Sequence, residues 1–351
     1  MTPMNQRGIG LVEILVALLI GLIVLGAVWN VFLSSRQGYR TNDALARVQD
    51  NGRFAASLLS RELRLAGYKG LCGQDTPVNN LLDTTDPGYD AVLFNLDNAL
   101  LGWDDTGPTA SWAAGMNGYV AGTDVLLFKH AAVVPGVTAD GNTPANANAI
   151  SLTTESGIPA ATIVVVSDVL GCDMFQNRSS ANAKDLARGA GGGTPGNVNP
   201  GGNDFSHAYD GDMEINTFRS GLYYVGAGND GRPALRRMRF DAGSGNDELV
   251  ADGVEDMQIV YGEDTNGDRR VERYCRADTI ADWNAVVAVR VTLLVGNADA
   301  GVLSEQQVLE YDDGAADPDG ACDPVEIAPD TTDLRLRQVF TTTVALRNRL
   351  P

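Results

Sequence analysis

Four side chains in one stretch of this chain have the spacing of calcium ligands in a loop. They are Asp264, Asn266, Asp268 and Glu272. Calcium takes about six to eight oxygen ligands, and carboxylates and amides at alternate positions of a turn direct their oxygens toward one point. Two residues depart from the EF-hand pattern, because Arg269 stands where that loop has glycine and Cys275 where it has glutamate. A calcium-stabilised loop and a plain Asn-Gly turn between strands are both open interpretations.

Glu13 is an acid at the beginning of an apolar span. The 22 residues that follow it, 14–35, carry no charged side chain. A run of this length can cross a bilayer, which takes about 20 apolar residues. A secretory signal has an apolar core of about 7 to 15 residues and an A-x-A-like cleavage site, and this segment has neither. A carboxylate costs about 2.5 to 3.5 kcal/mol at the bilayer centre and less near the surface, so we expect Glu13 to have a partner.

Four cysteines are spaced too widely for a zinc site, and an exported protein would hold them as two disulfides. They are Cys72, Cys172, Cys275 and Cys322. Three connectivities are open from the sequence alone. We favour pairing the first with the second and the third with the fourth, because each pair joins neighbouring loops. The first pair would then hold the end of the long helix against the sheet.

Charge and histidine content oppose nucleic-acid binding and catalysis. The formal net charge is −19, which repels nucleic acid. The two histidines, His130 and His207, accompany no Gly-x-Ser-x-Gly or HExxH motif. The glycine-rich segment 188–203 lacks the Gly-Lys-Ser/Thr ending of a phosphate-binding loop, and we expect it to be a flexible excursion. We therefore predict a protein that is not an enzyme.

The elements that carry these residues begin with one long helix. Beyond the apolar span, apolar residues still recur three, four or seven positions apart. This pattern predicts an amphipathic continuation over 36–67 that ends near Gly67, a suitable C-cap residue. Counted from Ile9 the helix has about 58 residues and is roughly 85 Å long. A separate coiled coil is the competing interpretation, and Gly52 and the broken heptad oppose it.

After the helix the pattern changes to the alternation that is typical of strands. The expected strands are 124–129, 162–167, 221–225, 235–240, 257–261, 286–295 and 340–346. We predict an α+β fold in which the periplasmic half of the helix packs on an elaborated antiparallel sheet. No clear linker divides residues 68–351, so we expect one head domain.

The first residues resemble the leader of type IV prepilins and pseudopilins. The segment 1–8 is short and basic and ends in glycine, and a glutamate stands five residues after that glycine. The resemblance implies that prepilin peptidase cleaves after Gly8, that Ile9 becomes the methylated N-terminus, and that Glu13 pairs with the terminal amine of a neighbouring subunit. It divides the chain into leader 1–8, transmembrane helix 9–35, amphipathic half-helix 36–67 and head 68–351.

Five further segments are similar to the PilW family of minor pilins. They are 34–40, 47–55, 64–68, 252–258 and 341–349. The resemblance implies a minor pilin that primes type IV pilus assembly and joins the tip complex, supporting twitching motility and adhesion. Implied partners are other minor pilins, the major pilin, a PilY-type tip adhesin, prepilin peptidase and the inner-membrane assembly platform, but no nucleic acid. No cofactor is required, and calcium is the candidate ion.

The implied location is the bacterial inner membrane and then the extracellular pilus. Arg7 precedes the span, so the positive-inside rule places the N-terminus in the cytoplasm and the head in the periplasm. Two alternatives stay open. One is a pseudopilin of a type II secretion system, and the other is a membrane-anchored, calcium-dependent adhesin or binding module.

Overall fold

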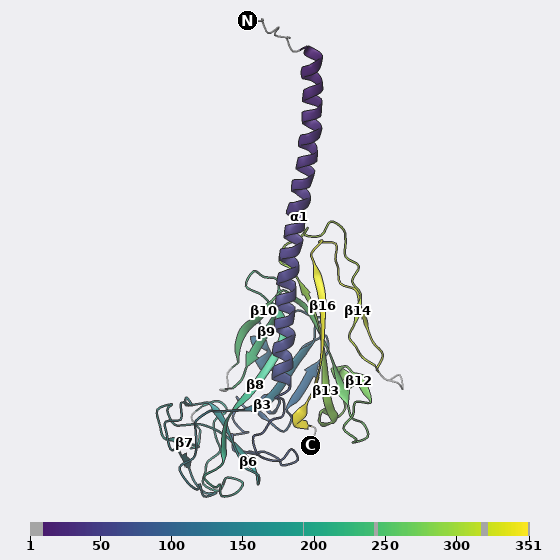
Figure 1. The fold of residues 1–351 in the computed structure, drawn as a ribbon. Coiled ribbons are helices and arrows are strands. Elements are labelled where there is room, and N and C mark those ends of the chain that lie inside the picture. The colour runs from purple at the N-terminus through teal and green to yellow at the C-terminus, as the bar shows by residue number, and fades with distance from the viewer. Residues whose placement is uncertain (1–9, 192, 242–244, 317–321, 350–351) are drawn as a thin grey trace, which may run out of the picture.

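The computed structural model describes residues 10–191, 193–241, 245–316 and 322–349. Helix α1 (Leu11–Leu63) extends as a single rod from a head that is rich in strands. Its N-terminal part projects beyond the head, and its C-terminal part runs alongside the sheets (Figure 1). This is the predicted α+β arrangement of one long apolar helix followed by a mostly antiparallel head.

The end of α1 lies four residues before the predicted one. After Leu63 the chain tightens into turns in which amides bond three residues back, as in Ala66 N to Leu63 O. Gly67 then takes the left-handed conformation with φ +78°, and its amide donates to the carbonyl of Lys129. The glycine therefore does terminate the helical segment, but through a tightened last turn.

The head contains two large sheets, where we had expected one. The eight-stranded sheet has the order β1-β6-β5-β8-β3-β2, and β9 and β10 extend it from β8. Its strands are β1 (Asn79–Asn80), β2 (Leu100–Trp103), β3 (Val125–Val133), β5 (Ile163–Ser167), β6 (Cys172–Gln176), β8 (Glu214–Ala227), β9 (Pro233–Arg239) and β10 (Asn246–Asp252). The four-stranded sheet has the order β12-β11-β13-β16. Its strands are β11 (Val254–Glu263), β12 (Arg273–Cys275), β13 (Val286–Gly296) and β16 (Arg337–Ala345).

Short elements complete the described residues. They are α2 (Ala91–Phe94), the strand pairs β4 (Ala149–Ser151) with β7 (Asp185–Ala187) and β14 (Tyr311–Asp312) with β15 (Glu326–Ile327), and the 3-10 helices Ser111–Gly115, Ala277–Thr279, Trp283–Ala285 and Arg347–Arg349. Each predicted strand overlaps an observed one. The unpredicted strands are short or carry polar side chains inward.

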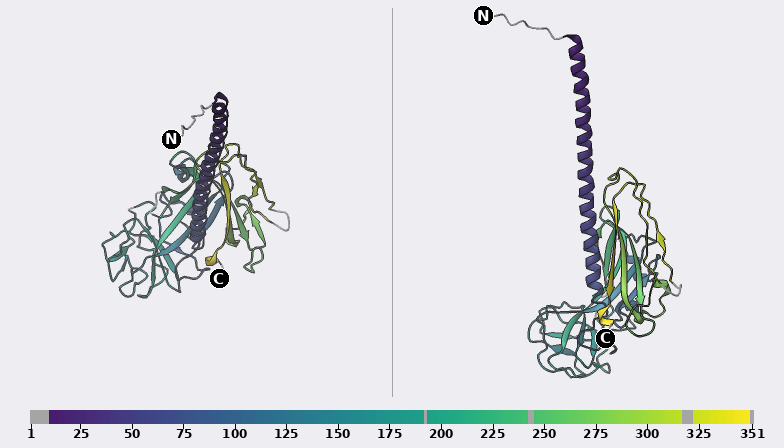
Figure 2. Two further views of the ribbon diagram at one scale, coloured as in Figure 1. Left: turned by 45° about the horizontal axis from the view of Figure 1, so that its top comes forward. Right: turned by 45° about the vertical axis from the view of Figure 1, so that its right-hand side comes forward.

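One core joins the helix to both sheets. Val48, Ala55 and Leu59 of α1 are buried with Phe128 of the large sheet and Val291 of the small one, among others. The chain passes from the large sheet to the small sheet directly, because only Gly253, at φ +77°, separates β10 from β11. The helix is thus the third wall of a core whose other two walls are sheets (Figure 2).

A distal lobe, which we define as residues 69–83 and 134–214, lies at the end of the head away from the free part of α1. Figure 1 shows β6 and β7 there. The lobe has its own core, including Phe175, Leu186 and Tyr209. The glycine-rich segment expected to be flexible packs on it, since Asn197 forms a bridge with Leu82 and Val198 N donates to Leu81 O.

Gly52 sets how closely α1 approaches the small sheet. A Cβ at this position would overlap the ring of Phe340 on β16, whereas a Cβ at Gly38 in the same helix meets nothing within 4 Å. We predict that Gly52→Ala lowers the free energy of unfolding, because overpacking costs about 1–3 kcal/mol and outweighs the gain of about 1 kcal/mol in helix propensity. Urea unfolding of the full-length protein in detergent measures this effect.

Gly38→Ala is the matched control. We expect it to be neutral or stabilising, because it gains helix propensity and meets no neighbour. If both variants were equally stable, the close contact between Gly52 and Phe340 would not limit the packing of the helix.

Candidate functional site

The apolar part of α1 is the first part of the candidate site. The expected cleavage position Gly8 and the new N-terminus Ile9 lie outside the described residues. Glu13 lies in the first turn, exposed, and its Oε2 accepts a hydrogen bond from the backbone amide of Gly10 at 3.2 Å. The carboxylate therefore has only a local partner within the described chain, at the outer end of the helix.

The span that follows Glu13 is covered by no part of the described head. Large aliphatic side chains from Leu11 to Leu33 are exposed all round the helix. α1 is long and apolar enough to cross a membrane. A helix that is hydrophobic on every side requires lipid or other helices around it.

The head first contacts the helix just after this span. Gln37 Nε2 and Thr41 Oγ1 both donate to the carbonyl oxygen of Val302, the latter at 3.3 Å. Further along, Ser60 Oγ and Thr342 Oγ1 lie 2.9 Å apart. Polar contacts at both ends and apolar packing between them fix the second half of α1 against the head.

Asn348 closes the other end of the helix. Its Nδ2 donates to the carbonyl oxygens of Arg64 at 3.1 Å and Ala66 at 3.3 Å. The last carbonyls of a helix have no partner inside the helix, so a side-chain donor there stabilises the helix end. In the sequence, Asn348 stands out only as part of the segment 341–349 that resembles the PilW family, and its contact with the helix carbonyls could not be inferred from the sequence.

The candidate calcium ligands lie in the loop between β11 and β12. Carboxylate oxygens of Asp264, Asp268 and Glu272 lie within 4.8 Å of one another. Asn266 is in the same loop, but its Nδ2 donates to Glu272 Oε1 and its Oδ1 accepts from the amide of Asp268. Three of the four candidate residues thus bring carboxylate oxygens together, and Asn266 lies beside them, hydrogen-bonded to Glu272 and to the amide of Asp268.

Asp264 organises this loop. Its carboxylate accepts the backbone amides of Asn266, Gly267 and Arg269. Desolvation raises the pKa of Asp264, but these hydrogen bonds together outweigh it and lower the pKa below its ordinary value. Arg269, which replaces the glycine of an EF-hand, adopts φ +70°, so the backbone keeps the turn that glycine would favour.

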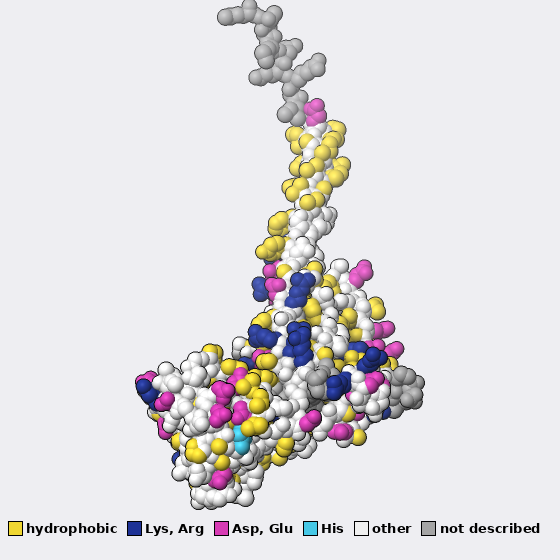
Figure 3. Space-filling model, turned by 60° about the horizontal axis from the view of Figure 1, so that its bottom comes forward, with side chains coloured by type: hydrophobic (Ala, Val, Ile, Leu, Met, Phe, Trp, Pro, Cys, Tyr) yellow, Lys and Arg dark blue, Asp and Glu magenta, His cyan; other side chains and the backbone are white. Residues whose placement is uncertain are grey.

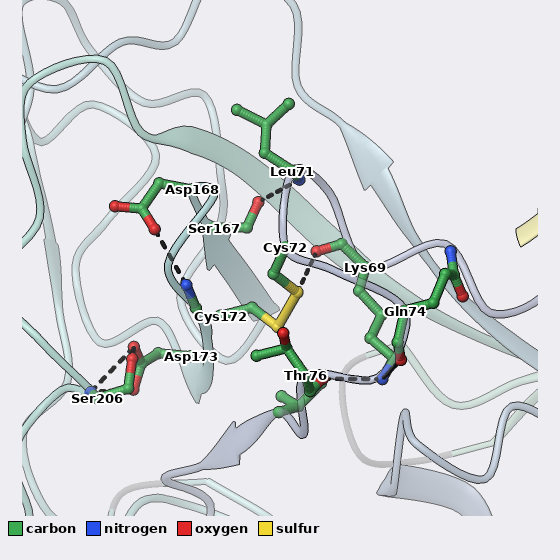
Figure 4. Close-up of a disulfide and its surroundings, with 12 residues drawn as sticks. Lys69, Leu71, Cys72, Gln74, Thr76, Ser167, Asp168, Cys172, Asp173 and Ser206 are labelled. Carbon is green, nitrogen blue, oxygen red and sulfur yellow. Dashed lines mark hydrogen bonds between the residues drawn. A yellow bond between two sulfur atoms is a disulfide. The ribbon is translucent and has the colours of Figure 1, made fainter. Parts of the chain in front are cut away.

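Two disulfides join the pairs that we favoured from the sequence. Cys72 is bonded to Cys172, and Cys275 is bonded to Cys322. Figure 4 shows the bond between Cys72 and Cys172, with Lys69 and Leu71 close to Cys72 in the segment that follows α1. Lys69 Nζ, which is almost fully buried, donates to Asp97 Oδ1 at 2.6 Å and to two backbone carbonyls. The segment after the helix is therefore fixed both covalently and by an ion pair.

A serine, a histidine and an aspartate converge beside this disulfide. His207 Nε2 lies 2.8 Å from Asp168 Oδ2, and His207 Nδ1 lies 2.9 Å from Ser206 Oγ. The Ser206 hydroxyl donates to Asp173 Oδ2 at 2.7 Å. Because this hydroxyl is engaged by a carboxylate, the cluster acts as a structural clamp that joins Asp168, Asp173 and the segment of Ser206 and His207.

Two family models match the chain. The model described as type IV pilus-assembly protein W, PilW, matches residues 222–348, and the model of the prokaryotic N-terminal methylation motif matches residues 3–29. Neither the curated proteins nor the solved structures include a match to the chain. The PilW match covers the end of β8, all of the small sheet and Asn348, while the distal lobe lies outside both matches.

The contact of Asn348 with the helix end leads to a test. We predict that Asn348→Asp lowers the free energy of unfolding by about 1–3 kcal/mol, because a carboxylate cannot donate to the carbonyls and its charge opposes the helix dipole. Chemical unfolding at pH 7 measures the effect. Asn142→Asp, at an exposed position in the distal lobe, is the control and should change stability little. Equal effects of the two variants would show that the helix end does not depend on Asn348.

Proposed function

We propose that this PilW-like type IV pilin primes assembly of the type IV pilus and forms part of the complex at its tip. The two family matches support a minor pilin of the type IV pilus that is anchored by its N-terminal helix and interacts with other pilus components. They also suggest a structural, non-enzymatic protein. Our proposal adds that the protein lies at the tip of the pilus, that it acts when assembly begins, and that twitching motility and adhesion depend on it.

The observation that carries the proposal is the continuity of α1. One helix holds Glu13 at its outer end, exposes an apolar span, and is fixed in the core of the head by its second half. An apolar span can bundle with the spans of other subunits, and Glu13 can pair with a neighbour's N-terminal amine. Any displacement of that bundle is transmitted to the head through a rod without a break.

The size and position of the distal lobe favour the tip. The lobe lies beyond the C-terminal end of α1, on the side of the head away from the span (Figure 1). A subunit in the shaft must leave room for others packed above it, whereas a subunit at the tip need not. We therefore place the lobe next to a PilY-type adhesin, with other minor pilins and the major pilin beneath.

The proposed course begins in the inner membrane, with the N-terminus cytoplasmic and the head periplasmic. Prepilin peptidase would remove the leader after Gly8 and methylate Ile9, and the assembly platform would then move the subunit into the extracellular fibre. The PilW match favours a pilus over the alternative, a type II secretion pseudopilin.

Deletion of the gene tests the priming role. We expect loss of sheared surface pili and of twitching, restoration by the wild-type gene, and no restoration by Glu13→Ala, because the buried amine of a neighbour would lose its counter-charge. Asp50→Ala removes an exposed acid from the same helix outside the span and should restore both. Normal piliation in the deletion strain would contradict the proposal.

We also propose that the loop of Asp264, Asp268 and Glu272 binds calcium in the extracellular medium. The convergence of three carboxylates supports this proposal. Bound calcium would stabilise the head. A calcium site is also what the alternative function requires, a calcium-dependent adhesin or binding module that is anchored by the helix.

Calcium should stabilise the full-length protein against unfolding. At a calcium concentration ten times the dissociation constant, the gain is about 1.4 kcal/mol relative to EGTA. Asp268→Asn should abolish this gain because it removes a charged ligand while keeping an oxygen for the amide of Arg270. Asp140→Asn, an exposed control, should keep it. An equal response of both variants to calcium would rule out the loop as the site.

A further inference from the structure

The loop between β5 and β6 carries two large apolar side chains into solvent. Val169 is 81% exposed and Leu170 is 73% exposed. Leu71 N donates to Ser167 Oγ, which places a third exposed aliphatic residue beside the base of the loop (Figure 4). Single exposed aliphatic residues are common on proteins, but a group of them on one protruding loop is typical of contact surfaces.

This loop is held rigidly. Asp168 Oδ1 accepts the amides of Leu170 at 2.7 Å and Gly171 at 3.1 Å, while its Oδ2 pairs with His207. Burial raises the pKa of Asp168, but these hydrogen bonds outweigh it and lower the pKa below its ordinary value. The disulfide between Cys72 and Cys172 lies at the base of the same loop. The backbone that carries the apolar side chains is therefore fixed before any partner binds, which reduces the entropy lost on binding.

The surroundings of the loop are acidic. The distal lobe has 11 aspartates and glutamates against four lysines and arginines, a net charge of −7. Glu214 lies opposite Ser167 in the strand register, and the exposed Asp210 and Asp212 precede it. Figure 3 shows hydrophobic side chains next to acidic ones on the face of the head that it presents. Such a surface repels the anionic face of a membrane and attracts a basic protein surface.

We propose that the Val169–Leu170 loop is the docking contact for another protein of the pilus tip, one that offers an apolar pocket bordered by lysine or arginine. The loop would enter the pocket, and the acidic rim would pair with the basic border. This inference rests on the proposed tip position. It lies outside both family-matched segments, so it concerns a contact of this chain's own lobe.

The test uses the full-length protein in piliated cells, with the photocrosslinker p-benzoyl-phenylalanine placed at 170. We expect illumination to yield one adduct with a different pilus protein, whose crosslinked region, identified by mass spectrometry, contains apolar and basic residues. The same probe at Val308, which is 89% exposed elsewhere on the head, is the control and should give no such adduct.

A second variant tests the same contact without a probe. Val169→Thr combined with Leu170→Asn keeps a turn-compatible sequence and removes the apolar surface. With p-benzoyl-phenylalanine at Leu71, this double variant should lower the adduct yield at least tenfold, while both disulfides form and the thermal midpoint stays unchanged. The control is Val308→Asn in the chain that carries the probe at Leu71 and has Val169 and Leu170 intact. It should leave the adduct yield unchanged.

Each other outcome overturns the inference. An adduct only with a second copy of this chain would assign a different occupant, and an adduct yield no greater than at 308 would mean that nothing docks there. The deletion strain distinguishes failure of this docking contact from failure of the proposed tip function. If deletion abolishes piliation but the otherwise wild-type chain with the probe at 170 forms no adduct with a different pilus protein, the docking contact alone is wrong.

Discussion

The structure depends on one helix whose two halves suit different surroundings. Its first half is apolar on every side and suits lipid, while its second half has one apolar face that only the head can cover. Neither sheet alone covers that face. The core forms because α1, the large sheet and the small sheet each supply one wall, and the close approach permitted by Gly52 brings the helix onto β16. The hydrophobic contact between them therefore carries the mechanical connection between span and head.

The head has two parts that differ in how they are held. The part matched by the PilW model is a sheet-and-helix scaffold, closed at the helix end by Asn348. The distal lobe is attached to it through the pairing of β5 with β8 and the ion pair of Lys69 with Asp97, while the disulfide of Cys72 with Cys172 joins the two segments of the lobe to each other. A covalent link restrains the unfolded chain, and the ion pair satisfies a buried charge. The scaffold that the PilW model matches thus holds a lobe that the model does not cover.

The charged residues are distributed unevenly over the molecule. The head, residues 68–351, carries a net charge of −22, whereas residues 1–67 carry +3 and the exposed side of the second half of α1 has arginines such as Arg36, Arg40 and Arg47. Inside the lobe, Asp173 is fully buried and accepts from Asn79, Ser206 and Tyr209, so one carboxylate joins β1, β6 and the loop between β7 and β8. Acidic residues therefore connect elements inside the lobe as well as giving its surface a negative charge.

The sequence by itself determined the long helix, because hydrophobic period and the absence of charge are local properties. It also determined most long strands, since alternation is local. It favoured the disulfide pairs that the structure shows but left three connectivities open, because the number and spacing of cysteines do not fix which of them meet. It missed β6, whose Asp173 and Gln176 face inward and break the apolar pattern. The cleavage site around Gly8 stays a prediction from the sequence. Only the tertiary structure decided the division into two sheets, the hydrogen bonds of Asn266 within its loop, the capping role of Asn348 and the exposure of Val169 and Leu170 on a fixed loop. Each depends on residues far apart in the chain or on side-chain direction, and neither periodicity nor composition encodes which distant segments meet.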